Sequence, residues 1–512
     1  MKKILFLFIL VLTACGLGGA PSGPQQAAEE ETFDDYYVIN TIDINQTSII
    51  AETRDYLRLS MRPPITLNPL LNEDVTVARI LGLIFEPLIT LNENFRHQSH
   101  LANVELASDF SSAVITIRSD AFWSDGQPVT AGDLIFSIET LRAAPAGVIY
   151  RSNIENIGEV TYINSRTVQV AFIQSSASAV NMLNFPIIPR HHYEGNLAET
   201  HFNPLGNGTY MFSSFAPTRN IRLEASPTTF RPLPLIEEIE VAFLPNDQTE
   251  LYAFNQGQID AINLPMQEWI RHHSVRDVNY QTFPAMYFEF VGFNFNNEIF
   301  SNLQTRQNIA MAFDARSAAE SIYLTHGVHA PSPIHPNSWA VSHVPGLVFN
   351  PEQRINIPDT LVIVVNEDNP QRVAIARRLS TDLTRAGADV LVDVLPYGEY
   401  FARIETGEFD LFIGGVNLSF VPEVQLFFRG GLFITISELE PYFTAMRLQF
   451  SEASYIQAVT NFSSNFAERV PVIGLAFRHC AVITNARVHQ NNPPFPDNVF
   501  GRVNEWYILP LF

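Results

Sequence analysis

Lysine is almost missing from this chain of 512 residues. Lys2 and Lys3 are the only two, and every other basic residue is arginine. With 53 acidic against 31 basic residues, the formal net charge is -22. Such a surface repels phosphate backbones, so we expect no nucleic-acid partner. Beyond the N-terminus, positive contacts to any bound solute must come from arginine, histidine or backbone N–H groups.

Cysteines and recognisable catalytic patterns are equally scarce. Two cysteines can form neither a disulfide framework nor a four-cysteine zinc site. The sequence contains no G-x-S-x-G elbow, no H-E-x-x-H, no Walker loop and no EF-hand loop. Histidines crowd between 326 and 343, but prolines break that segment, which favours a loop over metal ligands on one helix face. The sequence therefore predicts no enzyme, no catalytic residue, no cofactor and no metal site.

The first thirty residues have the pattern of an export signal. Residues 4–12 form an apolar run that is too short for a membrane span, which needs about 20 residues. Small residues then precede Cys15, as in the bacterial lipobox, where the cysteine receives the lipid. We expect a signal peptide at 1–14, lipid attachment at Cys15 and a flexible tether at 15–32, rich in Gly, Pro, Gln and Glu. The alternatives are an ordinary signal peptide and a buried N-terminal segment with an incidental cysteine.

Strands and helices are mixed through the rest of the chain. Residues 112–118, 166–173 and 236–244 alternate polar and apolar side chains, which is typical of half-buried strands. Thr130 followed by Asp133 predicts the start of an amphipathic helix. Further apolar runs are not long enough to span a membrane, since none reaches about 18 residues.

A strand–helix–strand–helix–strand unit stands out between 360 and 413. This order predicts a parallel sheet covered by helices, in which ligands bind beyond the carboxyl ends of the strands. The residues after the third strand, Asn417, Ser419 and Phe420, are therefore candidate ligand contacts. The alternative is a glycine-rich turn that only redirects the chain.

Seven short motifs in consistent order resemble one family, the extracellular solute-binding proteins of family 5, which serve ABC importers of oligopeptides, dipeptides and nickel. The motifs are 66–69 (TLNP), 121–133 (AFWSDGQPVTAGD), 203–210 (NPLGNGTY), 257–260 (GQID), 293–294 (FN), 308–315 (NIAMAFDA) and 407–410 (GEFD). Apart from the resemblance, each motif has a structural interpretation. Gly206 and Gly208 would supply backbone angles closed to other residues, and Asp260 would satisfy a turn.

The resemblance implies an α/β fold with two lobes, like large type II periplasmic binding proteins with an extra subdomain, and a ligand cleft between the lobes. We expect lobe I at 33–265, with the extra subdomain at about 70–165, lobe II at 266–475, and a return to lobe I at 476–512. The implied function is capture of a solute by hinge closure and its delivery to a permease.

Ligand contacts are predicted from position within this fold. Met61, Arg62 and Pro63 leave the first strand of lobe I, and Arg62 could bind a carboxylate or be a surface charge. Trp339 could offer a stacking face or be part of the core. Peptide-binding members place an aspartate near the position that Ser419 occupies, and this aspartate pairs with the peptide's free amine. The substitution suggests a modified peptide, a neutral solute or an anion as ligand, unless a shifted carboxylate such as Glu423 takes over.

We therefore expect a monomeric, lipid-anchored solute-binding protein on the extracellular or periplasmic side, with a peptide or small solute as ligand and ABC permease subunits as partners. Three alternatives remain at this point. They are a binder of nickel or another metal complex, a tethered sensor without a permease, and a tethered hydrolase, for which no nucleophile and base can be named.

Overall fold

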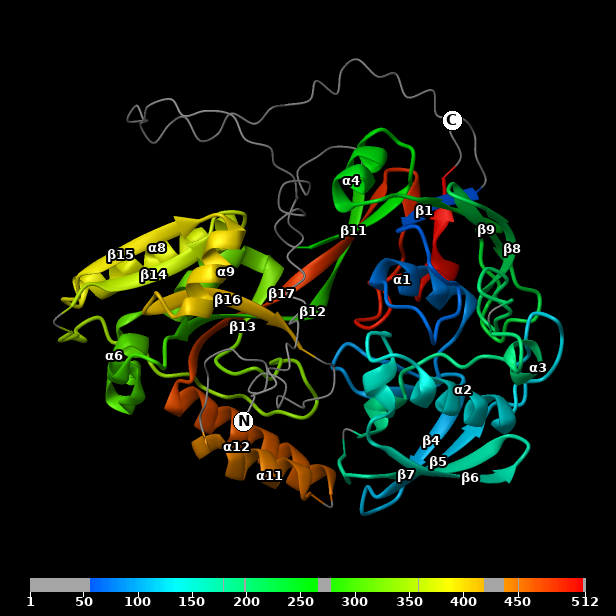
Figure 1. Cartoon of the computed structure of the whole chain (residues 1–512), viewed down its shortest axis with the longest axis horizontal. Helices are drawn as coiled ribbons and strands as arrows, with labels where there is room; N and C mark the ends of the chain where they lie inside the picture. Colours follow the sequence, from blue (N-terminus) through cyan, green and yellow to red (C-terminus); the bar gives the residue numbers. More distant parts are fainter. Residues whose placement is uncertain are drawn as a thin grey trace, which may run out of the picture.

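The computed structural model describes residues 56–177, 179–197, 199–265, 278–357, 359–418, 437–449 and 451–509. They form two lobes joined by two long strands (Figure 1). Here lobe I means the body built on 56–265 and 480–509, and lobe II the body built on 286–477. Within the described part of the chain, no helix is long and apolar enough to cross a membrane. Cys15, the signal and the tether lie outside the described residues.

Lobe I is organised around a mixed sheet with strand order β1-β10-β9-β8. Its members are β1 (Tyr56–Met61), β8 (Tyr210–Ala216), β9 (Asn220–Ala225) and β10 (Glu238–Phe243). The first strand runs parallel to β10, and the other pairs are antiparallel. Helix α1 (Val75–Ile84) begins at Asp74, whose carboxylate accepts hydrogen bonds from the N–H groups of Thr76 and Val77. Its apolar face is part of the lobe I core.

The extra subdomain of lobe I is an antiparallel sheet with strand order β4-β5-β7-β6. Its strands are β4 (Ala102–Leu106), β5 (Ser112–Ile117), β6 (Ile157–Asn164) and β7 (Thr167–Phe172), and a small hairpin, β2 (Ile89–Leu91) with β3 (His97–Ser99), lies before them. Helix α2 (Ala131–Ala143) has the predicted capping box of Thr130 and Asp133. The predicted strands at 112–118, 166–173 and 236–244 are confirmed as β5, β7 and β10.

The strand–helix–strand–helix–strand unit of lobe II is confirmed. It consists of β14 (Leu361–Asn366), α8 (Pro370–Arg385), β15 (Val390–Leu395), α9 (Tyr397–Thr406) and β16 (Leu411–Asn417). The strand β14 pairs in parallel with both β15 and β16, so all three carboxyl ends lie at one edge. Asn369 caps α8 and Gly407 ends α9 with a φ of 75°.

Two strands run from one lobe into the other and form a ribbon. The strands β12 (Val278–Phe293) and β17 (Val472–Asn485) are antiparallel along nearly their whole length, with a register shift between Pro284 and Phe288. At the lobe I end β17 also pairs with β11 (Ala261–Pro265), and at the lobe II end β12 pairs with β16. The predicted boundaries at 265/266 and 475/476 stay predictions, since 266–277 lies outside the described residues and 475/476 falls inside β17.

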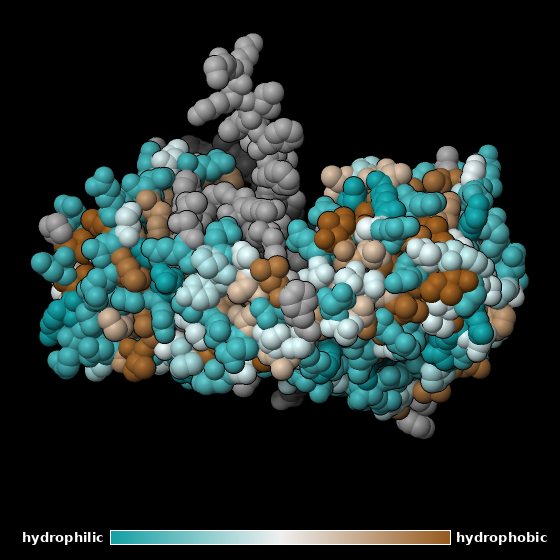
Figure 2. Space-filling view, turned by 90° about the horizontal axis from the view of Figure 1, so that it is seen from below, coloured by the Kyte–Doolittle hydropathy of each residue, from teal (hydrophilic) through white to brown (hydrophobic). Residues whose placement is uncertain are grey.

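Helices complete lobe II below and beside this sheet (Figure 1). They are α6 (Leu303–Ala312), α7 (Ala315–Tyr323), α11 (Glu440–Arg447) and α12 (Glu452–Arg469), and a short strand β13 (Gly327–His329) adds to β17. Lobe I further holds α3 (Arg190–Tyr193), α4 (Asp247–Asn255), β18 (Val488–His489) and β19 (Tyr507–Ile508). Seen from below, the surface is mostly hydrophilic, with smaller hydrophobic groups over both lobes (Figure 2).

Candidate functional site

The lobe I half of the candidate site follows β1. Met61 is 1% exposed, so its side chain belongs to the lobe I core, and its carbonyl accepts a hydrogen bond from Leu244 N at 2.9 Å. Pro63 is exposed. Of these two predicted residues, only Pro63 presents a side chain to the surface of the described structure.

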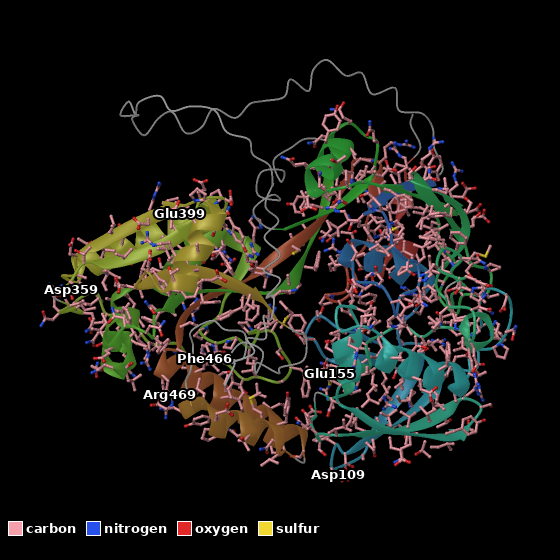
Figure 3. The ribbon with its side chains drawn as sticks, in the orientation of Figure 1. Asp109, Glu155, Asp359, Glu399, Phe466 and Arg469 are labelled. Carbon is pink, nitrogen blue, oxygen red and sulfur yellow. The ribbon has the colours of Figure 1, made fainter. Side chains whose placement is uncertain are left out.

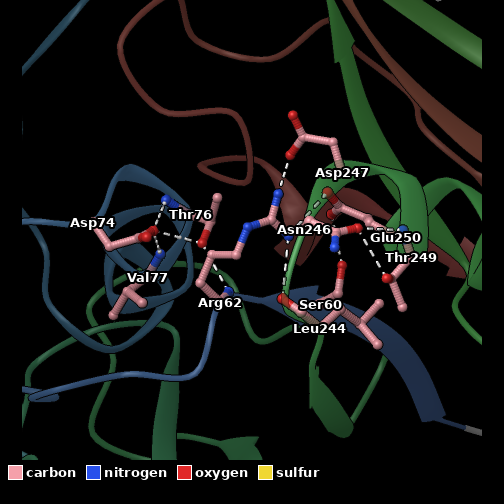
Figure 4. A network of polar contacts seen from close by, with 10 residues as sticks. All are labelled: Ser60, Arg62, Asp74, Thr76, Val77, Leu244, Asn246, Asp247, Thr249 and Glu250. Carbon is pink, nitrogen blue, oxygen red and sulfur yellow. Dashed lines mark hydrogen bonds and ion pairs between the residues drawn. The ribbon is translucent and has the colours of Figure 1, made fainter. Parts of the chain in front are cut away.

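The guanidinium group of Arg62 contacts other residues of lobe I (Figure 4). Its Nη1 donates to the carbonyl of Leu244 at 3.2 Å, its Nη2 pairs with Asp247, and Glu250 lies 3.9 Å from Nη1. Burial raises the pKa of Glu250, although the hydroxyl of Ser60 donates to its carboxylate at 2.7 Å. A ligand carboxylate would have to displace Asp247 to reach this guanidinium, so carboxylate binding by Arg62 stays a prediction.

The lobe II half of the site follows β16. Asn417, the last residue of the strand, is exposed and lies opposite Tyr287 of β12. Leu418 is half-buried, and its N–H donates to the carbonyl of Met286 at 2.8 Å. Ser419 and Phe420 lie outside the described residues. The exit of the strand thus offers one exposed amide at the position where the topology predicts a ligand.

A buried charge cluster lies beneath this exit. Glu289 of β12 is 0% exposed, and both Arg372 of α8 and Arg478 of β17 approach its carboxylate, at 2.9 Å and 3.2 Å. Burial alone would lower the pKa of Arg372, but Glu289 together with Tyr287 and Tyr400 outweighs burial and raises it. Gly415 of β16 touches the cluster, since a Cβ there would lie 2.6 Å from Arg372 Nη2.

Aromatic and polar groups extend this cluster toward the strand ends. The Arg478 guanidinium lies 3.7 Å from the ring centroid of Tyr287, and Arg372 Nη1 donates to Asn366, the last residue of β14, at 3.4 Å. Sequence reasoning did not name Glu289, Arg372 or Arg478. The available signal was a charge inside an apolar strand, as in 287–293 (YFEFVGF) and 475–480 (LAFRHC).

Trp339 lies between the lobes. Its backbone N–H donates to the carbonyl of Asn94 at 3.0 Å, and its ring lies 5.2 Å from the Arg96 guanidinium and 5.7 Å from the Tyr455 ring. The half-buried side chain packs against the same hydrophobic cluster of lobe II as Leu418 does. The structure therefore brings Trp339 to the cluster on which the β16 exit rests, and a ligand-stacking role stays a prediction.

A matching family model covers residues 98–430, which is more than half of the chain, and describes the bacterial extracellular solute-binding proteins, family 5. The chain belongs to family 5. One curated relative is the oligopeptide-binding protein AppA of Bacillus subtilis (strain 168), 22% identical over 404 residues, which are 71% of this chain and 74% of the relative.

Solved structures of family 5 type share the fold. The structure of AppA from Bacillus subtilis in complex with a nonapeptide matches with a TM-score of 0.62 at 17% identity, covering 89% of this chain and 98% of that one. NikZ from Campylobacter jejuni in complex with Ni(L-His) matches with a TM-score of 0.67 at 19% identity, covering 88% and 99%. These likenesses confirm the two-lobed periplasmic-binding-protein fold.

The family 5 motifs serve the fold in this chain. Asp260 accepts from Arg58 N at 2.7 Å and from Asn485 Nδ2 at 2.7 Å, and it pairs with the Arg58 side chain. It therefore ties β1 and the C-terminal end of β17 to the start of β11, which is more than the predicted turn. Asp410 accepts from Val362 N at 2.8 Å and holds the amino end of β14.

The prediction that Gly206 and Gly208 supply backbone angles closed to other residues is wrong. Neither Gly206 nor Gly208 has a positive φ. Instead, a Cβ on Gly206 would lie 1.9 Å from the carbonyl oxygen of Ile84, and one on Gly208 would lie 2.3 Å from that of Leu83. The two glycines allow the chain to cross the last turn of α1 at close range.

A cavity and the histidines of the chain also bear on its ligand chemistry. A cavity of about 380 Å³ lies at the amino ends of β14 and β16, opposite the predicted ligand edge, and its lining includes Asn294 and Asp410, both already hydrogen-bonded. In the part of the chain that the structure describes, no three His, Cys, Asp or Glu residues are grouped as metal ligands. His335 is 1% exposed, and burial lowers its pKa to about 3.

Proposed function

We propose that the protein is the lipid-anchored substrate-binding component of an ABC importer. It captures peptides or peptide-like solutes outside the membrane by closing its two lobes, and it delivers them to permease subunits. Membership of family 5 over residues 98–430 is the observation that carries this proposal. Cys15 would carry the lipid, and the following residues to 32 would hold the lobes away from the membrane.

The β12–β17 ribbon supports hinge closure. Both strands belong to one seven-stranded sheet that runs from β11 at the lobe I end to β15 in lobe II, and the register shift between Pro284 and Phe288 interrupts their ladder midway. Interrupted pairing is where a two-stranded ribbon bends most readily. Closure about this point brings the exits of β1 and β16 toward each other, with Pro63 on one side and Asn417 on the other.

The proposed ligand class is peptides or peptide-like solutes without a strong requirement for a free amine. AppA of Bacillus subtilis is named an oligopeptide-binding protein, and NikZ was solved with Ni(L-His). Ser419 stands where peptide binders of the family carry an aspartate, so the charge-assisted hydrogen bond to an amine is missing there. N-blocked peptides should therefore bind about as well as peptides with free amines.

A thermal-shift panel tests the ligand class. Free peptides, N-acetylated peptides and Ni²⁺ with L-histidine are added to the full chain, because any ligand of the folded state raises the Tm. Asn417→Ala should weaken the peptide shift, whereas Asn461→Ala, an exposed amide on α12 of the same lobe, should leave it intact. The peptide proposal is wrong if no peptide raises the Tm while the nickel complex does.

Anchoring and the permease require separate tests. Cys15→Ser should move the protein from the membrane fraction to the soluble fraction and abolish incorporation of radioactive palmitate. If permease and ATPase subunits are encoded beside this gene, their reconstitution with the protein should give ligand-dependent ATP hydrolysis. Ligand binding without any permease that responds would instead favour the tethered sensor.

A further inference from the structure

The extra subdomain carries two phenylalanines in a backbone conformation that favours glycine. Phe95, at the tip of the β2–β3 hairpin, has a φ of 59°, and Phe110, between β4 and β5, has a φ of 55°. Both close a turn of the same kind, since Phe95 N donates to Asn92 O and Phe110 N donates to Ala107 O, each at 2.9 Å. A bulky residue persists in the left-handed region only where its surroundings hold it there.

The side chain of Phe95 packs mainly against residues of the other lobe. Its side chain is 2% exposed and is part of the lobe II cluster that contains Phe288 and Phe477. The imidazole of His335 lies edge-on to it at 4.7 Å and contacts Phe477 at the same centroid distance. Phe110 packs against this cluster as well, while remaining half-buried.

Polar contacts fix the hairpin tip on both of its sides. On lobe II, Trp339 N donates to Asn94 O at 3.0 Å, and Arg96 pairs with Glu452 at 2.5 Å. On its own lobe, Asn181 Nδ2 donates to the carbonyl of Phe95 at 3.2 Å. The tip is thus clamped between the lobes by an aromatic side chain, a main-chain hydrogen bond and an ion pair.

We propose that the tip of the β2–β3 hairpin, residues 92–96, is a latch between the lobes. Phe95 seated in lobe II, as in this structure, holds the two lobes together, and opening about the β12–β17 ribbon withdraws its side chain into water. In Figure 1 the subdomain lies next to α11 and α12, below the ribbon, so the latch and the hinge hold the lobes at different places. The proposal gives the extra subdomain a role in setting ligand affinity, and it rests on the hinge closure proposed above.

The sharpest variant is Phe95→Gly, because glycine keeps the left-handed turn while it removes the side chain from lobe II. Thr218→Gly is the matched control. Thr218 has a φ of 64° in the exposed β8–β9 hairpin of lobe I, so the substitution relieves the same conformation without touching the lobe interface. Phe95→Asn is the second variant, since asparagine also tolerates this conformation and is too polar for an aromatic cluster.

The readout is the distance between the lobes in ligand-free protein, measured by double electron–electron resonance. Spin labels are placed at Glu155→Cys in lobe I and Glu399→Cys in lobe II, both exposed and marked in Figure 3, with Cys15 and Cys480 replaced by serine and alanine. Phe95→Gly should shift the distance distribution of the ligand-free protein toward the long-distance, open population, compared with the parent. Thr218→Gly should match the parent.

The latch is overturned if Phe95→Gly or Phe95→Asn, folded as judged by circular dichroism, keeps the parent distance distribution. The distance measurement needs no ligand. A thermal-shift panel in which no peptide raises the Tm would therefore not decide whether the latch exists. Conversely, a protein that binds peptides but shows no change in distance with Phe95→Gly would retain the proposed function and lose the latch.

Discussion

Arg372 on α8 donates from Nε to Oε2 of Glu289 on β12 at 2.9 Å, across 83 positions of the chain. The Nη2 group of the same guanidinium lies 3.3 Å from Oε1, so the pair uses both carboxylate oxygens. Arg478 approaches the same carboxylate from β17. A single buried acid therefore connects the helix-covered part of lobe II to the ribbon that leads to lobe I.

Glu289→Gln should destabilise the protein by about 3 kcal/mol, because removing one partner of a buried ion pair leaves uncompensated charge inside the protein. The measurement is the free energy of unfolding from urea titration. The control is Glu320→Gln, whose 62% exposed side chain pairs with Arg316 on the surface of α7 and should contribute under about 0.5 kcal/mol. Equal effects of the two substitutions on the free energy of unfolding would contradict the stabilising role of the buried Glu289 pair.

Asp260→Ala should also lower the free energy of unfolding by about 3 kcal/mol. The Asp260 carboxylate joins β1, β11 and β17, and its removal leaves the Arg58 side chain without this partner. Asp247→Ala supplies the comparison, because Asp247 also pairs with an arginine, Arg62, but is 55% exposed. Its removal should change the free energy of unfolding by about 1 kcal/mol or less. Urea titration of both variants separates the two cases.

Gly206→Ala should destabilise the protein by about 3 kcal/mol, because the added Cβ meets the carbonyl of Ile84 and neither backbone segment can yield. Gly398→Ala is the opposite case. Gly398 lies in α9 with no atom within 4 Å of a Cβ built there, so alanine should stabilise the helix by about 0.5 kcal/mol. An unchanged stability of Gly206→Ala would refute the close approach described for Gly206, and a destabilised Gly398→Ala would contradict the open space around Gly398.

Titration of Asp497 should contribute to the pH dependence of the free energy of unfolding. Its Oδ1 is enclosed without a hydrogen-bond partner among the described residues, while Oδ2 accepts from Asn184. Burial raises its pKa from 3.8 to about 6. An acid whose pKa rises on folding favours the folded state while it is protonated, and this contribution is lost as the pH rises from about 4 through 6.

Asp497→Asn should therefore be more stable than the parent at pH 7.5, by about 2 kcal/mol, and the gap should close by pH 4. Urea titrations at pH 7.5, 6, 5 and 4 measure it. The exposed Asp359, at the far end of lobe II in Figure 3, provides the control, and Asp359→Asn should shift stability by less than about 0.5 kcal/mol at each pH. A gap that is independent of pH would show that the Asp497 carboxyl titrates normally.

The sequence predicted those helices and strands whose signals come from neighbouring residues. The capping box at Thr130 and the alternation in β5 and β7 depend on neighbours in the sequence, and each was predicted in place. The family resemblance supplied the two lobes. The place of Asn417 at the exit of β16 follows from the predicted topology, since parallel strands end at a common edge, and its contact with a ligand stays a prediction.

What the sequence could not predict depends on distant partners. Arg62 reads as a possible carboxylate ligand until α4 places Asp247 beside it. Phe95 and Phe110 show no sign in the sequence of their left-handed backbone, because the cluster of lobe II against which their side chains pack comes from distant parts of the chain. Charge pairs such as Arg372 and Glu289 likewise form through tertiary packing. No periodic pattern in the sequence indicates which residues will pair.

The route of the chain through the ribbon also orders the folding of the two lobes. Lobe II is built from one continuous stretch, so it can pack as soon as β17 emerges. Lobe I must wait for the end of the chain, since β11 pairs with residues 480–484 and its core includes Phe500 and Trp506. An N-terminal lobe whose last strand arrives more than 200 residues later forms its long-range contacts slowly. Export before synthesis ends would keep lobe I open until translocation is complete.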